Sequence, residues 1–117
     1  MTEEPGSPLA RLRRGLARLL GLVPVLDLHG LGVADAVRAT ELFLAEAAAE
    51  GRDEVRIVYG KGRRGPGGVG ALRVAIPDLV AARTGIVRRF ERQVEGDGHD
   101  GSMRVWLRTD ARDGRAS

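Results

Sequence analysis

Two residues at the end of one apolar segment have side chains that could do chemistry together. The run Leu26-Asp27-Leu28-His29 sets a carboxylate and an imidazole two positions apart, and alternate side chains of a strand lie on the same face. Imidazole has a pKa of about 6.5 and exchanges protons near neutral pH. A neighbouring carboxylate can fix its tautomer or hold a divalent cation. The pair therefore predicts a functional site that transfers protons or holds a cation. The alternative is that the pair is purely architectural and orders a neighbouring loop.

A glycine-rich segment follows about thirty residues later. It begins Gly60-Lys61-Gly62, and Lys61 is the only lysine beside 18 arginines, so a compact ammonium lies where the backbone leaves space. The stretch up to Gly65 also matches G-x-G-x-x-G formally. A dinucleotide site needs an acidic residue about twenty positions later, and the region of Arg83-Thr84-Gly85 has none. We therefore predict no nucleotide cofactor.

The hydrophobic pattern predicts the element order β-α-β-α-β-β. The first two strands flank a crossover helix and should be parallel, whereas the last two should form a hairpin. The predicted fold is therefore an α/β (α+β) two-layer sandwich, a four-stranded mixed sheet with two helices on one face. The strands are expected at Val25–His29, Glu54–Tyr59, Ile86–Val94 and Ser102–Arg108, and the helices at Val33–Glu50 and Ala71–Arg83. Pro77 predicts that the second helix is kinked or starts late.

Three segments are predicted along the chain. Residues 1–23 form an extension with an amphipathic helix at Pro8–Leu20, residues 24–109 form the domain, and residues 110–117 form a disordered tail. We favour a helix that packs on the domain or frays. The alternative is a basic helix that touches RNA, the ribosome or a membrane surface.

Composition narrows the class of protein. A chain of 117 residues fits one domain, and the absence of cysteine excludes disulfides and thiolate-ligated metals. The net charge is +3 and the sequence pI is about 10.5, which suits a nucleic-acid partner. With no long apolar run and no basic leader, we expect a soluble, cytoplasmic protein without a membrane partner. The sequence leaves its oligomeric state open.

The last strand carries a second group of candidate residues. Arg104, Trp106 and Arg108 alternate with apolar residues, so they should lie on the sheet face that the helices leave open, together with Asp27 and His29. A positive face that bears an aromatic ring is typical of surfaces for single-stranded nucleic acid. The alternative for Trp106 is ordinary half-buried packing.

Together these motifs resemble the Smr (small MutS-related) domain over about residues 24–108. The resemblance rests on Leu26-Asp27-Leu28-His29-Gly30, on Val55 to Gly62, on the helix start Ala71-Leu72-Arg73 and on Val105-Trp106-Leu107-Arg108. It implies an α/β sandwich that binds nucleic acid and, in several members, an endonuclease or nicking activity on DNA or RNA, with some members acting on messenger RNA at ribosomes. The family's LDxH motif corresponds to Asp27 and His29, and its loop to Gly60, Lys61 and Gly62. This chain has Tyr59 where members usually carry His or Thr.

The expected function is therefore an Smr-type endonuclease that cleaves or nicks phosphodiester bonds, with RNA ahead of DNA. The alternative is a non-catalytic module that binds nucleic acid or the ribosome through the same surface. A divalent cation, Mg or Mn, is a candidate cofactor with Asp27 as its ligand. The expected catalytic residues are Asp27, His29 and Lys61, where Lys61 and the Gly60–Gly62 amides neutralise phosphate charge. The expected nucleic-acid contacts are Gly60, Gly62, Arg63, Arg64, Arg104, Trp106 and Arg108.

Overall fold

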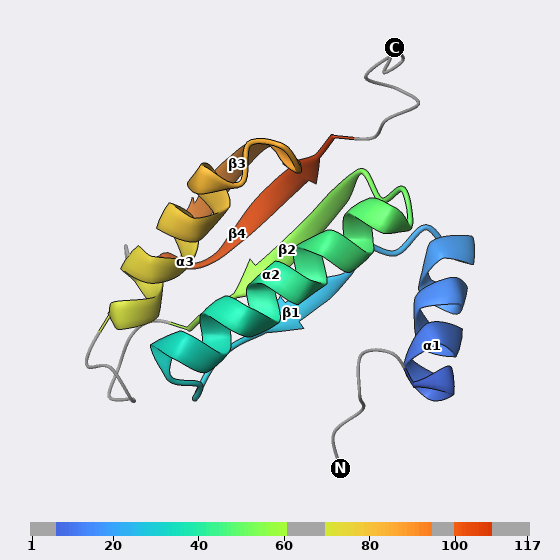
Figure 1. The fold of residues 1–117 in the computed structure, drawn as a ribbon, viewed down its shortest axis with the longest axis horizontal. Coiled ribbons are helices and arrows are strands. Elements are labelled where there is room, and N and C mark those ends of the chain that lie inside the picture. The colour runs from blue at the N-terminus through green and yellow to red at the C-terminus, as the bar shows by residue number, and fades with distance from the viewer. Residues whose placement is uncertain (1–6, 61–69, 95–99, 109–117) are drawn as a thin grey trace.

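A computed structural model describes residues 7–60, 70–94 and 100–108, with three helices and four strands among them (Figure 1). The strands lie in the order β1-β2-β4-β3; β1 is parallel to β2, and β4 is antiparallel to both of its neighbours. The predicted four-stranded mixed sheet is confirmed. The elements are α1 (Pro8–Leu19), β1 (Val25–Asp27), α2 (Val33–Ala49), β2 (Glu54–Val58), α3 (Ala71–Ala82), β3 (Val87–Val94) and β4 (Asp100–Leu107). The predicted tail lies outside the described residues.

The helices α2 and α3 cover the same face of the sheet (Figure 1). The apolar stripes of both helices belong to one core with alternate residues of the strands. Val55 pairs with Val105, and Ile57 pairs with Met103, across β2 and β4, and all four side chains are fully buried. Because side chains alternate along a strand, the residues between them must face solvent on the other side.

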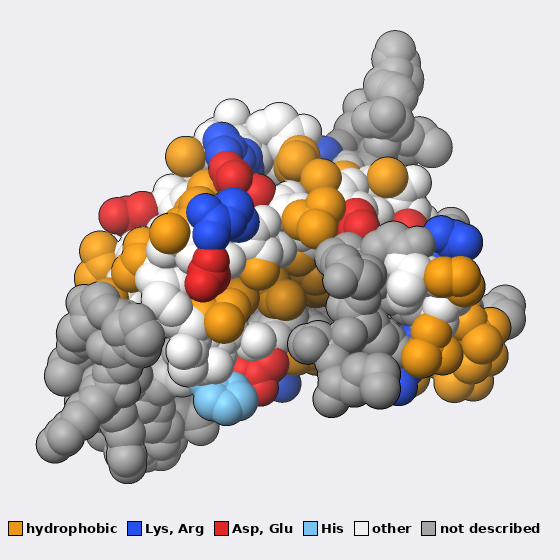
Figure 2. All heavy atoms as spheres, turned by 60° about the horizontal axis from the view of Figure 1, so that its bottom comes forward, with side chains coloured by type: hydrophobic (Ala, Val, Ile, Leu, Met, Phe, Trp, Pro, Cys, Tyr) orange, Lys and Arg blue, Asp and Glu red, His pale blue; other side chains and the backbone are white. Residues whose placement is uncertain are grey.

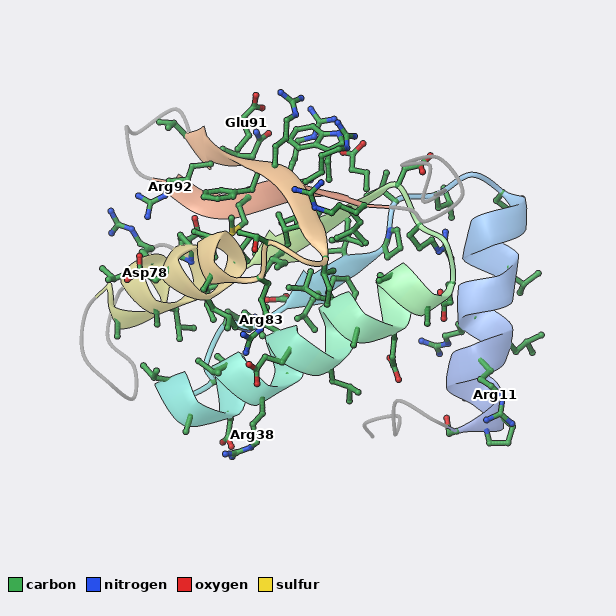
Figure 3. The ribbon with its side chains drawn as sticks, turned by 45° about the horizontal axis from the view of Figure 1, so that its top comes forward. Arg11, Arg38, Asp78, Arg83, Glu91 and Arg92 are labelled. Carbon is green, nitrogen blue, oxygen red and sulfur yellow. The ribbon has the colours of Figure 1, made fainter. Side chains whose placement is uncertain are left out.

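The open face of the sheet is polar and rich in arginine. Arg56 pairs with Arg104, and Trp106 lies between Glu54 of β2 and Arg89 of β3. Glu91 pairs with Arg104, and Figure 3 shows Glu91 projecting from β3 on the side away from the helices. This face holds the predicted nucleic-acid residues of β4, as the alternation pattern indicated.

Pro77 lies inside α3, which begins at Ala71, so the alternative of a late start is wrong. A proline has no N–H to donate to the carbonyl four residues earlier, here that of Arg73. In the structure this carbonyl instead accepts a hydrogen bond of 3.1 Å from the Arg92 side chain of β3 (Figure 3). The Arg92 side chain of β3 thus takes the place of the N–H that Pro77 cannot donate to the carbonyl of Arg73.

The helix α1 forms as predicted, but its apolar side is not buried. Leu9, Leu12, Leu16 and Leu20 are all at least half exposed, and Figure 2 shows apolar side chains gathered at the surface over this helix. These four leucines therefore do not pack on the domain, which was one of the two outcomes expected for this helix. No helix among the described residues is long and apolar enough to cross a membrane.

Thr40 offers a test of the core beneath α2. Its side chain is fully buried, and its hydroxyl has no hydrogen-bond partner within the described part of the chain. Replacing Thr40 with Val keeps the branched shape and the helix propensity and removes an unsatisfied polar group. We expect Thr40→Val to raise the free energy of unfolding by about 1 kcal/mol in urea denaturation.

Thr40→Ser is the matched control, because it keeps the hydroxyl and removes the buried methyl group. It should lower the free energy of unfolding by about 1 kcal/mol. A Thr40→Val variant less stable than the wild type would show that the hydroxyl contributes a net favourable hydrogen bond.

Candidate functional site

The carboxylate of Asp27 and the imidazole of His29 form a hydrogen-bonded pair at the surface. Oδ1 of Asp27 lies 2.8 Å from Nδ1 of His29 and also accepts the backbone N–H of His29 at 3.1 Å. The side chains of His29 and Asp27 are 77% and 55% exposed, respectively. The backbone contact orders the local turn, as the architectural alternative foresaw, but the imidazole itself is left accessible to a substrate.

This geometry fixes the tautomer of the imidazole. The hydrogen bond from the His29 side chain is the largest influence on the pKa of Asp27 and lowers it below its usual value of 3.8. Partial burial opposes this shift, and the backbone bond from His29 lowers the pKa further. The carboxylate is therefore ionised at neutral pH and can only accept, so Nδ1 of His29 must be the donor. In the neutral ring, Nε2 then carries the lone pair. An exposed Nε2 oriented through Nδ1 is suited to take a proton.

The strand β1 ends at Asp27, two residues earlier than predicted, so His29 lies on the turn that follows. Leu28 still donates to the carbonyl of Val58 at 2.7 Å, and its own carbonyl accepts from Leu31 at 3.1 Å. Leu28 is fully buried. Leu28 lies between Asp27 and His29 in the chain, so its burial fixes the backbone there and keeps both polar side chains on the solvent side.

Gly60 lies directly beside His29, as the parallel pairing of β1 and β2 predicted. A Cβ atom added at Gly60 would come 3.6 Å from Cβ of His29, and the glycine has a φ of +83°. Its N–H donates to the carbonyl of Gly101 at 3.0 Å. This amide therefore already has a backbone partner within the fold, and its expected contact with phosphate stays a prediction.

Tyr59, which stands where the family usually has His or Thr, is part of the core. Its side chain is only 3% exposed, and its hydroxyl donates to the carbonyl of Ser102 at 3.3 Å. Its N–H also donates to Gly101. A buried hydroxyl with a backbone partner does not face a substrate beside His29, so the described site contains one imidazole and no second proton-transfer group from this position.

The site offers little for a metal ion on its own. No group of three or more histidine, aspartate or glutamate side chains that could hold a metal occurs in the ranges 7–60, 70–94 and 100–108. One oxygen of Asp27 is already committed to His29. The other oxygen fits only the kind of Mg²⁺ or Mn²⁺ site in which one carboxylate is completed by water and substrate phosphates.

The predicted arginines of β4 share the open face with this pair but lie farther along it. Asp27 pairs with Val58, and Val58 pairs with Ser102, so Ser102 lies two strands from Asp27 at the same height in the sheet. From the spacing between strands and the rise per residue, Arg104 and Trp106 lie roughly 12 and 16 Å from Asp27. Arg108, at the far end, donates from Nε to the carbonyl of Thr84 at 2.7 Å.

Two arginines that were not predicted as site residues join this surface. Arg89 of β3 lies 4.0 Å from the ring centre of Trp106, and Arg56 of β2 is exposed beside Arg104. The pairing of Arg89 with Trp106 depends on a register shift between Val87 and Arg89. That shift is not visible in the sequence, where Arg88 and Arg89 are adjacent and either one satisfies the alternation pattern.

The remaining predicted site residues, Lys61, Gly62, Arg63 and Arg64, lie outside the described residues. Gly60 is the last described residue before them. Their part in the site stays a prediction.

Comparison with known proteins agrees with the fold and the motif order. The model of the Smr domain matches residues 26–108, and the chain belongs to this family. It is 35% identical over 115 residues to an "Endonuclease MutS2" of Symbiobacterium thermophilum and 37% identical over 105 residues to one of Thermus thermophilus. These matches cover 88% and 90% of the chain but only 13% and 12% of the relatives.

A solved structure supports the same assignment. The crystal structure of the Smr domain of Thermus thermophilus MutS2 superposes with a TM-score of 0.62 at 36% identity, covering 74% of this chain and 99% of that chain. The predicted family and fold class are thereby confirmed.

The hydrogen bond between Asp27 and His29 can be tested by titration. We expect the carboxyl of Asp27, followed by NMR, to titrate below 3.8, and His29→Ala to move its pKa back towards 3.8, because the imidazole is the largest cause of the shift. A lowered pKa means that ionised Asp27 stabilises the fold above the unfolded value and that this contribution is lost as pH falls through the folded value.

The control is His99→Ala, which removes the chain's other histidine and should leave the titration of Asp27 unchanged. An Asp27 that titrates at or above 3.8 in the wild type would show that the pair does not persist in solution.

Proposed function

We propose that this domain binds nucleic acid and cleaves its phosphodiester bonds, with His29 as the general base. The observation that carries the proposal is the 2.8 Å contact that orients an exposed imidazole through Nδ1. On RNA, Nε2 takes the proton of a ribose 2′-hydroxyl, whose oxygen attacks phosphorus while the bond to the 5′-oxygen breaks and that oxygen takes up a proton. On DNA, water replaces the hydroxyl.

Several features support this proposal. The family includes the domain of MutS2 proteins, which are named endonucleases, and the open sheet face carries more arginines than carboxylates near Trp106. We place RNA ahead of DNA, because an exposed positive sheet face suits single strands and RNA supplies its own nucleophile. Lys61, Arg63 and Arg64 are proposed to bind the phosphates through their positive charges.

Asp27 is proposed to orient His29, and a divalent cation bound to its second carboxylate oxygen would neutralise charge on a substrate phosphate. A chelator therefore belongs in the assay.

Purified protein with end-labelled RNA and DNA strands of matched sequence tests the proposal, with and without chelator. We expect cleavage by the wild type and a loss of about a hundredfold or more in His29→Ala, because a general base contributes 10²–10⁴-fold. Asp27→Ala should also lose cleavage, since the imidazole then lacks its fixed tautomer. Affinity for the strands should change little in either variant.

His99→Ala is the control for nonspecific loss of a histidine and should cleave like the wild type. Equal cleavage by His29→Ala would place the chemistry elsewhere or in a contaminant.

One observation favours a second function, a binding module without chemistry. Tyr59 is buried and hydrogen-bonded, so the site lacks the side chain that the family usually places there. Binding to RNA or DNA without cleavage by the wild type would establish this alternative. The ribosome is a further proposed partner, through the basic helix that contains Arg11 to Arg18 and on which Leu12 is exposed. Co-sedimentation of the wild type and Leu12→Glu with ribosomes would test this proposal.

A further inference from the structure

The open face contains an arrangement of three side chains that the cleavage chemistry does not use. Trp106 of β4 is half-buried, and the guanidinium carbons of Arg89 and Arg104 lie 4.0 and 4.7 Å from the centre of its ring. Arg89 comes from the neighbouring strand, and Arg104 lies two residues away on the same strand. Such distances are typical of cation–π contacts, which are stronger with tryptophan than with other aromatic residues.

Arg89 is the more available of the two arginines. Among the described residues it has no hydrogen bond or ion pair besides its contact with Trp106. A guanidinium has five N–H donors in a planar fork that matches a phosphate. The ring holds this fork in place and leaves its donors available for an anion.

Arg104 is partly engaged by an acidic neighbour. Its Nε donates to Glu54 at 2.8 Å, and this hydrogen bond is the main cause that raises the pKa of Arg104, with a smaller contribution from Glu91. The ion pair uses one of the five donors and fixes the direction of the side chain. The terminal nitrogens stay outside that bond.

Positive charges outnumber negative charges on this part of the open face, which favours an anionic partner. The arginines are Arg56, Arg89 and Arg104, and their acidic neighbours are Glu54 and Glu91. Arg108 adds a further positive charge at the end of the strand. Figure 3 shows nitrogen-bearing side chains gathered on this side of β3 and β4, close to Glu91. Asp27 and His29 lie on the same face at the other end of the strands.

The contacts of Trp106 conflict with its expected role as a base-stacking surface. A base could stack on the ring only where the guanidiniums do not already lie over it, and displacing them would cost the cation–π contacts. The arginine groups, and not the indole, are therefore the surface offered to a ligand.

We infer that Arg89 and Arg104, held in place on Trp106, bind phosphates of a nucleic-acid strand that extends from the Asp27–His29 pair, and that Trp106 is a positioning residue. This inference rests on the proposed function and specifies how the strand is recognised. The pair and this cluster lie roughly 12 to 16 Å apart by strand spacing and rise, so one bound strand would reach both places. Recognition here is independent of base identity, because the backbone carries no sequence information.

The test compares two single strands of equal length, an oligothymidylate and the same backbone with abasic sites, bound to the full chain and measured by fluorescence anisotropy. If phosphates alone are bound at this cluster, the two dissociation constants should agree within fivefold. Arg89→Gln should weaken both equally and reduce the slope of log affinity against log salt by about 0.7, the value for one phosphate on a single strand.

Arg38→Gln is the matched control, since Arg38 on α2 is exposed, is paired with Asp35 and lies on the helical side of the sheet. It removes the same charge and should leave the salt slope nearly unchanged. Trp106→Leu should weaken both strands to the same extent, and Trp106→Phe, which keeps an aromatic face, should restore part of the affinity.

Three results would overturn the inference. The first is a preference of more than fivefold for the strand with bases, if Trp106→Leu abolishes that preference. The second is an Arg89→Gln variant that binds no more weakly than Arg38→Gln. The third is that neither strand binds. The last result, repeated with an oligouridylate of the same length, would also defeat the proposed function. The first two leave it intact, because cleavage by the wild type and its loss in His29→Ala are measured separately.

Discussion

Burial of only one face of the sheet is the constraint on which the rest of the structure depends. The helices α2 and α3 cover one side, so every second side chain of the central strands must be apolar and the others must be compatible with water. Val55, Ile57, Met103 and Val105 meet the first requirement with no exposed surface. The same alternation sets Arg56, Arg104 and Trp106 on the other side, so one packing requirement creates both the core and the open face that carries the candidate site.

At one end of that surface the fold turns a short motif into a defined chemical group. The buried Leu28 anchors the turn, the ionised Asp27 accepts twice from His29, and Gly60 allows the neighbouring strand to end beside the imidazole. The position before Gly60 serves the core, because Tyr59 is buried there and its hydroxyl donates to the backbone of β4. Within the part of the chain that the structure describes, the site is therefore built around one oriented imidazole.

Farther along the face, aromatic and basic side chains combine in a way that residue types alone would misassign. A tryptophan between arginines suggests a stacking surface, yet here the arginines lie over the ring. In the inferred arrangement, the indole organises guanidiniums that bind phosphate and does not itself stack on bases. The two ends of the open face would then have different tasks, proton transfer at Asp27 and His29 and backbone binding at Arg89 and Arg104.

The sequence by itself determined the element order, the family, the shared face of Asp27 and His29 and the approach of Gly60, because each follows from local periodicity and from the parallel pairing of a strand–helix–strand unit. Only the tertiary structure decided how these groups are engaged. Arg92 donates to the carbonyl of Arg73, which Pro77 cannot serve. The amide of Gly60 is taken by Gly101, and Leu9, Leu12 and Leu16 of α1 remain exposed. It also brought Arg89 to Trp106 through an irregular register in the β3–β4 hairpin. Such contacts join residues far apart in the chain, so they depend on packing and register, which no local pattern encodes.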